Sequence, residues 1–170
     1  IISIFKDIYK LDKNIFFDHK IISGRGDIVK VKIFKKNLYL VDESYNSNPL
    51  SLKSALKNFD MIKINNSKKH LVLGDMLELG KYSKKLHTEA GNSINKTSLK
   101  NVNVIGKHVK WLFNSLDKKK RGIIMKNKSQ IIDLIKSRLN NNDYLMIKGS
   151  NTTGLNSLTN QIKSSKINAL

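Results

Sequence analysis

Short apolar runs alternate with segments of helical periodicity along most of this chain. The runs are rich in Val, Ile and Leu, as strands buried on both faces are, and the segments between them repeat apolar residues at helical spacing. Because strands and helices alternate with short connections, the pattern predicts an α/β fold with a doubly wound, mostly parallel sheet. The expected strands are 27–34, 38–41, 70–74, 103–105, 122–125 and 144–147, and the expected helices are 49–59, 83–96, 109–116, 131–139 and 155–167.

The first two expected strands differ from the others because no helix separates them. Residues 27–34 alternate apolar and polar side chains over most of their length, and residues 38–41 form a second apolar run. Lys35, Lys36 and Asn37 lie between the two and are expected to make a tight turn. The sequence therefore predicts an antiparallel hairpin on the N-terminal side of the sheet.

The residues before this hairpin follow a different pattern. Residues 1–10 repeat apolar side chains at helical spacing, as the end of a helix would. Residues 11–26 show no clear periodicity and close on Ser-Gly-Arg-Gly at positions 23–26, which is typical of a linker. The chain begins with Ile1 rather than Met, so we expect it to be part of a longer polypeptide.

The formal net charge is +19, from 32 basic and 13 acidic residues. One interpretation is a nucleic-acid-binding module, in which a basic surface contacts the phosphate backbone. The other is compositional bias, because only three of the basic residues are arginine and the lysines are scattered without interleaved aromatic residues. We favour compositional bias and keep the basic nucleic-acid-binding module as the alternative.

Other totals narrow the class of protein. The chain has no cysteine, which excludes disulfides and thiolate chemistry. No apolar run approaches the roughly 20 residues that cross a bilayer, and the N-terminus lacks the layout of a secretion signal. These features fit a cytoplasmic protein with no membrane span.

Polar and Gly-containing clusters follow several of the expected strands. They lie at residues 42–49, 74–80, 106–108 and 148–151. The carboxyl ends of parallel strands share one edge of a sheet, and ligands of open α/β sheets bind in the crevice there. We therefore expect these clusters to meet and to form a binding edge.

Within the first cluster, two residues have competing interpretations. Asn48 precedes Pro49 at the expected start of a helix, so an N-cap and a ligand contact are equally good explanations. Asp42 lies too far upstream to cap that helix, which favours a ligand contact.

In the other clusters, Lys148 follows a buried strand and precedes Gly-Ser at a helix start, a placement that suits an anionic group. Asp75 and Glu78 lack a third metal ligand nearby, so no metal site is predicted. His87 falls on a helix next to Leu86, and a partly buried structural role is expected for it.

The motifs of self-sufficient catalysis are missing. The chain has no G-x-x-x-x-G-K-[ST] loop, no G-x-G-x-x-G after a strand, no Cys/His cluster and no G-x-S-x-G elbow. The sequence thus predicts a binding edge without its own catalytic apparatus.

Five segments resemble the C-terminal domain of the Mur ligases. They are residues 23–26 (SGRG), 42–49 (DESYNSNP), 73–80 (LGDMLELG), 86–91 (LHTEAG) and 148–150 (KGS). Within that family the resemblance is to the branch that adds D-alanyl-D-alanine to UDP-N-acetylmuramoyl-tripeptide in peptidoglycan precursor synthesis. It implies a Rossmann-like domain at 27–170, a linker at 23–26, and the tail of a central ATPase domain at 1–22.

The family activity implied by this resemblance is ATP-dependent amide ligation. ATP phosphorylates the terminal carboxylate of the tripeptide, and the amine of D-alanyl-D-alanine attacks the acyl phosphate. The P-loop and the Mg²⁺ ligands belong to the central domain, so this chain is expected to be inactive by itself. A related ligase, such as one that extends folate with glutamate, is a further alternative, against which the GDMLELG segment argues.

The resemblance also implies roles for single residues at the ATP site. Arg25 matches an arginine that reaches the phosphates of ATP, and Asp42 matches an acid that binds the ribose hydroxyls. Tyr45, Asn46 and Asn48 would lie near the adenine and the ribose.

A second implied set lines the pocket for the dipeptide and the γ-phosphate. It consists of Asp75 and Glu78 in the segment 75–80, together with Lys148 and Ser150.

Overall fold

A six-stranded sheet forms the centre of the protein, whose computed structural model describes residues 24–164. The expected tail at 1–22 and the first linker residue, Ser23, lie outside this range. The strands are β1 (Asp27–Ile33), β2 (Lys36–Glu43), β3 (Lys69–Gly74), β4 (Val102–Ile105), β5 (Arg121–Met125) and β6 (Tyr144–Lys148). The helices are α2 (Pro49–Met61), α3 (Ser83–Asn95), α4 (Val109–Ser115), α5 (Ser129–Arg138) and α6 (Leu155–Lys163).

The strand order confirms the predicted fold class. The order across the sheet is β1-β2-β6-β3-β4-β5, in which β1 and β2 are antiparallel and all other neighbours are parallel. Strand β6 is last in the sequence but lies between β2 and β3, so the carboxyl ends of these three strands are adjacent. This arrangement brings together the loops that follow them.

The hairpin forms as predicted, but its turn is not at residues 35–37. The two turn residues are Phe34 and Lys35, which have φ angles of 47° and 63°. Ile33 pairs with Lys36, so Lys36 and Asn37 extend β2 instead of turning. Two-residue hairpin loops favour turns with positive φ at both positions, because the twist of such turns matches the twist of the flanking strands. At this hairpin that preference outweighs the strain of placing Phe34 at positive φ.

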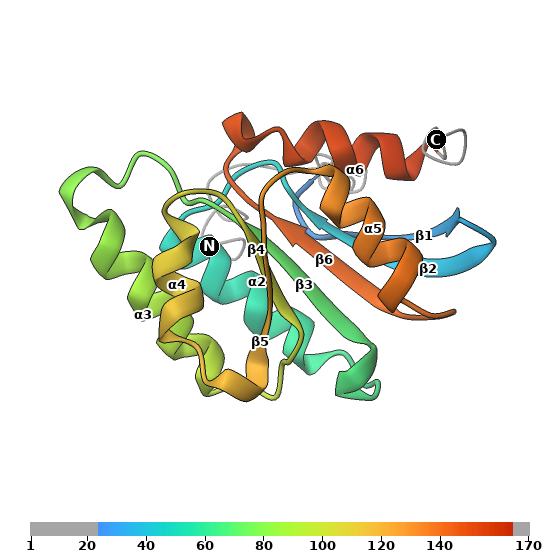
Figure 1. The fold of residues 1–170 in the computed structure, drawn as a ribbon, viewed down its shortest axis with the longest axis horizontal. Coiled ribbons are helices and arrows are strands. Elements are labelled where there is room, and N and C mark those ends of the chain that lie inside the picture. Colours follow the sequence, from blue (N-terminus) through green and yellow to red (C-terminus); the bar gives the residue numbers. More distant parts are fainter. Residues whose placement is uncertain (1–23, 165–170) are drawn as a thin grey trace, which may run out of the picture.

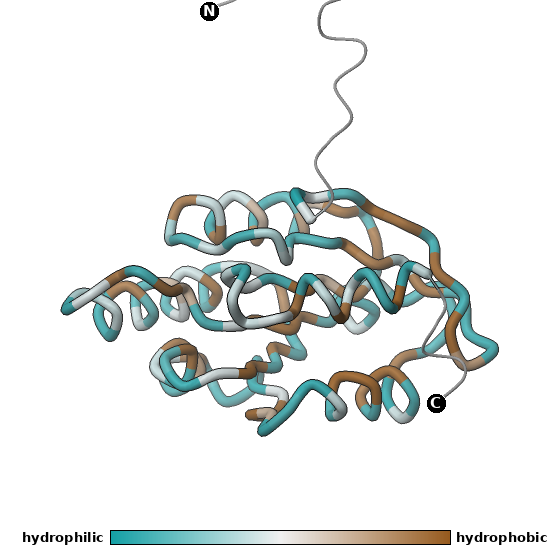
Figure 2. Tube along the Cα trace, turned by 90° about the horizontal axis from the view of Figure 1, so that it is seen from above, coloured by the Kyte–Doolittle hydropathy of each residue, from teal (hydrophilic) through white to brown (hydrophobic). Residues whose placement is uncertain are grey.

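Two hydrophobic cores lie on opposite faces of the sheet. Helices α2, α3 and α4 cover one face, on which Val41 and Met146 are buried, and α5 and α6 cover the other, on which Leu40 and Leu145 are buried (Figure 1). Successive residues of a strand point to opposite faces, so each central strand contributes to both cores. Brown and teal alternate along the helical turns in Figure 2, as expected for helices with one hydrophobic side.

Within residues 24–164, no helix is both long enough and apolar enough to cross a bilayer.

Candidate functional site

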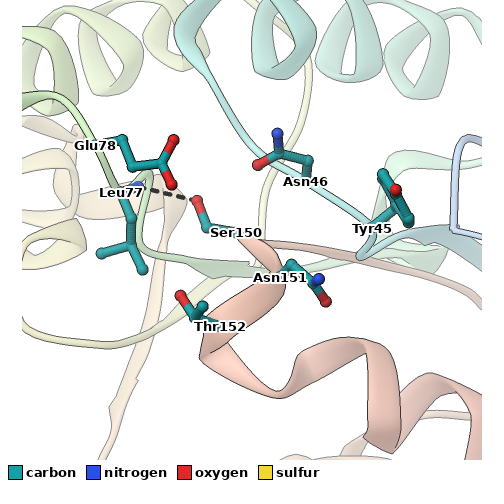
Figure 3. Close-up of a pocket in the computed structure, with 7 residues that line it drawn as sticks. All are labelled: Tyr45, Asn46, Leu77, Glu78, Ser150, Asn151 and Thr152. Carbon is teal, nitrogen blue, oxygen red and sulfur yellow. Dashed lines mark hydrogen bonds between the residues drawn. The ribbon is translucent and has the colours of Figure 1, made fainter.

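The loops after β2, β3 and β6 meet at the carboxyl edge of the sheet, as the sequence predicts. The Ser150 hydroxyl accepts a hydrogen bond from the backbone N–H of Leu77 at 2.9 Å (Figure 3) and donates one to the carbonyl of Ser47 at 3.2 Å. The Ser150 N–H donates to the Asp75 carbonyl at 3.0 Å. Ser150 is 5% exposed. Its main effect is therefore to hold the three loops together.

Two adjacent hollows open at this edge. The first, the Arg25 pocket, encloses about 310 Å³ and is lined mainly by Arg25, Glu43, Tyr45, Asn46, Asn48 and Lys148. The second, the Ser150 pocket, encloses about 270 Å³ and is lined mainly by Tyr45, Asn46, Leu77, Glu78, Ser150 and Thr152 (Figure 3). Tyr45 and Asn46 line both hollows. Four of the five residues predicted for ATP thus share the first hollow.

An ion pair between the buried Lys148 ammonium and the half-buried Glu43 carboxylate lines the Arg25 pocket. Glu43 and Lys148 are register partners on the parallel strands β2 and β6, and the Lys148 ammonium donates to Glu43 Oε2 at 3.2 Å. It also donates to the Asn46 carbonyl at 2.9 Å. Burial lowers the pKa of Lys148, an effect that the Glu43 carboxylate partly offsets. In the structure the Lys148 ammonium thus pairs with a carboxylate of the protein and holds the loop that carries Asn46, and its contact with a ligand stays a prediction.

Arg25 lies over the ring of Tyr45. The distance from the guanidinium carbon to the ring centroid is 4.6 Å, which is a cation–π contact. The Tyr45 N–H donates to the Gly24 carbonyl at 3.1 Å, and Gly24 has a φ of 89°. A Cβ at residue 24 would lie 2.9 Å from the Tyr45 nitrogen, so only glycine allows this approach. The linker segment thereby sets Arg25 against the loop after β2.

Asp42 does not line the Arg25 pocket. Its side chain is fully buried on the opposite face of the sheet. Its Oδ1 accepts from the N–H and hydroxyl of Ser44 at 3.0 and 2.5 Å, and its Oδ2 forms an ion pair with Lys163 at 2.5 Å. Asp42 has the strand parity of the buried Leu40, whereas Glu43 has that of Val41 and turns toward the pocket. The carboxylate at the pocket is therefore that of Glu43, which sequence reasoning missed.

Asn48 is both an N-cap and a pocket residue. Its Oδ1 accepts from the Ser51 N–H at 2.8 Å, and the Ser51 hydroxyl accepts from the Asn48 N–H at 3.1 Å, which completes a capping box. Asn48 also lines the Arg25 pocket. The cap half of the prediction is confirmed, and the ligand half stays a prediction.

Asp75 and Glu78 separate in the structure. Glu78 has a φ of 63° and lines the Ser150 pocket. Asp75 instead accepts from the backbone N–H groups of Lys107, His108 and Val109 at 3.0, 2.9 and 2.7 Å. These groups form the entry to α4, so the Asp75 carboxylate caps that helix and fixes the loop at 106–108.

No cluster of three or more potential metal ligands occurs among the residues that the structure describes. The Asp75 carboxylate accepts three hydrogen bonds, all from backbone N–H groups. Any Mg²⁺ that acts with this edge would need ligands beyond this pair.

His87 has a structural role, as predicted. It is fully buried, its Nε2 accepts from the Met76 N–H at 3.1 Å, and its Nδ1 lies 2.7 Å from the Ser83 carbonyl. This pair of contacts requires the neutral tautomer with the proton on Nδ1. Desolvation lowers the pKa of His87 below its ordinary 6.5.

The stability of the domain is expected to fall as the pH drops from about 7 to about 5. Above pH ~6.5 His87 is neutral in both the folded and the unfolded protein. Below that pH the unfolded chain takes up a proton on His87, whereas the folded chain does not, because burial lowers the pKa of His87. His87→Gln should lower the free energy of unfolding at pH 7 and make that free energy depend less on pH. Urea denaturation at several pH values between 5 and 8 would measure both effects. His70, whose pKa burial also lowers, should keep a residual slope. An unchanged slope in His87→Gln would contradict this assignment.

The chain is similar to proteins of known family. The family described as "Mur ligase, glutamate ligase domain" matches residues 24–151. UDP-N-acetylmuramoyl-tripeptide–D-alanyl-D-alanine ligases from Rickettsia prowazekii and Buchnera aphidicola (subsp. Acyrthosiphon pisum) are 29% and 32% identical to it. These matches cover 85% and 88% of this chain. The chain spans 31% of the length of either relative.

Solved structures show the same fold. A MurF ligase from Thermotoga maritima in complex with ADP superposes with a TM-score of 0.72 at 22% identity, over 96% of this chain and 36% of that one. MurF from Acinetobacter baumannii superposes with a TM-score of 0.66 at 20% identity, over 86% of this chain and 31% of that one. The match over residues 24–151 shows that this chain belongs to the Mur ligase family, with the domain described as its glutamate ligase domain.

Proposed function

We propose that this domain provides one wall of the ATP site of an amide ligase and that the Arg25 pocket is that wall. The observation that carries the proposal is the set of groups gathered there: a guanidinium, a buried ammonium, a carboxylate and a tyrosine ring. The similarity of the fold to a MurF ligase in complex with ADP supports a nucleotide as the ligand.

The groups of the pocket fit the parts of ATP. The Arg25 guanidinium has the forked donors and fixed charge that phosphates require. The Glu43 carboxylate can accept hydrogen bonds from the two ribose hydroxyls, a role for which Asp42 is too deeply buried. Tyr45, Asn46 and Asn48 offer a ring face and amides to the adenine.

Lys148 is assigned a positioning role in the same pocket. Its ammonium fixes the Glu43 carboxylate and the Asn46 carbonyl, so it sets the distance between the ribose acceptor and the adenine wall. Its charge also favours nucleotide phosphates at this edge.

The Ser150 pocket is proposed to hold the amine substrate. Curated relatives of this chain are UDP-N-acetylmuramoyl-tripeptide–D-alanyl-D-alanine ligases, so we propose D-alanyl-D-alanine as the amine and the UDP-linked tripeptide as the acid. Glu78 places a carboxylate near the ammonium end of such a dipeptide, while Asn151 and Thr152 offer hydrogen-bonding groups to its amide. ATP, when bound, supplies the phosphoryl group that converts the acid into an acyl donor.

Mg²⁺ is expected to act with ATP but not to be held by this edge alone. The two carboxylates of the GDMLELG segment do not converge, since Asp75 caps α4 and Glu78 faces the Ser150 pocket. We propose that another part of the enzyme contributes the metal ligands and the P-loop, and that the isolated chain does not hydrolyse ATP.

The proposal is tested by titrating ¹⁵N-labelled chain with ATP. We expect weak binding, with shifts at Gly24, Asn46 and Gly149, and a Kd that rises roughly tenfold in both Glu43→Gln and Arg25→Gln, since each change removes a charged hydrogen bond. Lys110→Gln, an exposed charge change on α4, should leave the Kd unchanged. Shifts that avoid these loops, or equal effects of all three variants, would reject the ATP assignment.

A further inference from the structure

A third hollow lies at the opposite edge of the sheet, by the amino ends of β3, β4 and β5. This hollow, the Arg138 pocket, encloses about 340 Å³ and is lined mainly by Ser67, His70, Asn101, Asn103, Arg121 and Arg138. It shares no residue with the Arg25 or Ser150 pockets. Nothing in the proposed ligase chemistry uses it.

The basic residues of this pocket are unusual for the chain. Arginine accounts for only three of 32 basic residues, yet two of the three, Arg121 and Arg138, line this one hollow. No lysine, aspartate or glutamate is among the residues that line it. A guanidinium differs from an ammonium in its planar fork of donors, which matches phosphate oxygens in pairs. Scattered surface charge from compositional bias would have placed lysines there.

Arg121 is held in position before any ligand arrives. Its Nε donates to the Leu116 carbonyl at 3.0 Å and its Nη2 to the Asn114 carbonyl at 2.8 Å. Its guanidinium also lies 5.6 Å from the Phe113 ring centroid. The two hydrogen bonds leave Nη1 free to donate to a ligand. Because they already fix the side chain, a ligand would not have to order it on binding.

The floor of the pocket is equally fixed. Asn103 lies at an irregularity between β4 and β5, and its amide donates to the carbonyls of Leu71 and Asn101, each at 3.0 Å. Its Oδ1 accepts from the Ile123 N–H at 3.1 Å. A Cβ at Gly122 would lie 2.3 Å from that same Oδ1. A side chain at residue 122 is thereby excluded, and the hollow stays open.

Among the residues that the structure describes, no carboxylate forms an ion pair with Arg121 or Arg138. Asp143 is buried, and its Oδ2 contacts His70 Nε2 at 3.3 Å and accepts from the Asn140 N–H at 2.8 Å. The arginine side chains carry the positive charge of the pocket. Ser67 also lines it, and its hydroxyl donates to Asn65 Oδ1 at 3.0 Å.

We propose that the Arg138 pocket binds a small phosphate-bearing molecule at a site separate from the ATP wall. Its volume is at the low end of the range of small-molecule sites, which suits a phosphate or pyrophosphate group with a small substituent. A phosphate presents two charges and several oxygens, enough to engage both guanidinium groups, whereas a single carboxylate can pair with only one of them.

The probe is inorganic pyrophosphate, titrated into ¹⁵N-labelled chain at constant ionic strength and near 150 mM salt. The expected result is saturable shifts at Ser67, Asn101 and Gly122. Arg138→Gln should raise the pyrophosphate Kd at least tenfold, and Arg138 is suited to this test because it is exposed at the end of α5. Lys110→Gln makes the same charge change elsewhere on the surface and should leave the Kd unchanged.

Three results would overturn the proposal. Equal weakening by Lys110→Gln and Arg138→Gln would show general attraction to a positively charged protein. Loss of the Ser67 and Gly122 shifts in Arg25→Gln would assign the pyrophosphate to the Arg25 pocket. Malonate binding to Ser67 and Gly122 as tightly as pyrophosphate would reject phosphate as the ligand class.

Discussion

Gly91→Val is expected to destabilise the domain by about 3 kcal/mol or more, the upper range of overpacking effects. Gly91 lies in α3 where this helix touches α4, and a Cβ there would lie 2.0 Å from Ser115 Oγ and 2.5 Å from the Leu112 carbonyl oxygen. Ser115 can rotate, but the Leu112 carbonyl belongs to the backbone of α4. The two helices would have to separate, which would open the core beneath them. Urea denaturation would measure the loss.

Asn92→Val provides the matched control. Residue 92 is the next position of the same helix and is exposed, so the same new side chain meets solvent there. Only the helix propensity changes, by a few tenths of a kcal/mol. If Gly91→Val and Asn92→Val had equal effects, the close approach of α3 and α4 at Gly91 would not be a feature of the folded protein.

Asp42→Ala is expected to cost about 3 kcal/mol of folding stability, because it leaves the Lys163 ammonium without its buried partner. Lys163 is 17% exposed in its side chain and is shared between Asp42 and Asp27, at 2.5 and 2.6 Å. The Asp27 and Asp42 carboxylates raise the pKa of Lys163 despite its desolvation. The same change also removes the carboxylate that accepts from the N–H and hydroxyl of Ser44, whose hydroxyl keeps Thr159 Oγ1 as a neighbour at 2.9 Å. Urea denaturation and the melting temperature report the effect.

Asp27→Ala and Glu43→Ala are the comparison variants, which separate the effect of each carboxylate on folding stability from its effect on nucleotide binding. Asp27 is partly exposed, so its loss should cost about 1 kcal/mol while Asp42 remains paired. Glu43→Ala should weaken nucleotide binding and also cost folding stability, because it leaves the buried Lys148 ammonium with only the Asn46 carbonyl as a partner. If Asp42→Ala proved as stable as the parent chain but bound ATP less tightly, Asp42 would be a ligand residue, as the sequence resemblance implies.

The fold was predictable because each element carries its own periodic signal. Central strands such as 70–74 are apolar on both faces, and the amphipathic segments between them are long enough to be helices. The hairpin turn was misplaced by one residue because cross-strand pairing, and not local turn preference, assigns Lys36 to a strand. Such pairing is set by contacts that are distant in sequence.

The site was predictable in outline, since loops at the carboxyl ends of parallel strands must converge. The choice between neighbouring residues was harder. The alternation Leu38-Leu40-Asp42 already indicated that Asp42 shares the face of two buried leucines, so strand parity was the available signal for Glu43. No local signal shows that Asp75 caps a helix more than 30 residues downstream, because that contact depends on strands β3 and β4 lying side by side.

The wall formed by Tyr45 and Asn46 separates the Arg25 and Ser150 pockets and belongs to both. A ligand in one pocket that immobilises this wall lowers its conformational freedom. A second ligand in the other pocket then loses less entropy in ordering the same two residues. The two occupancies are therefore thermodynamically linked, and the linkage is reciprocal: whatever factor the first ligand contributes to the affinity of the second, the second contributes to the first. A wall two residues wide is thus enough for each pocket to respond to whether the other is filled, by the same factor in either order.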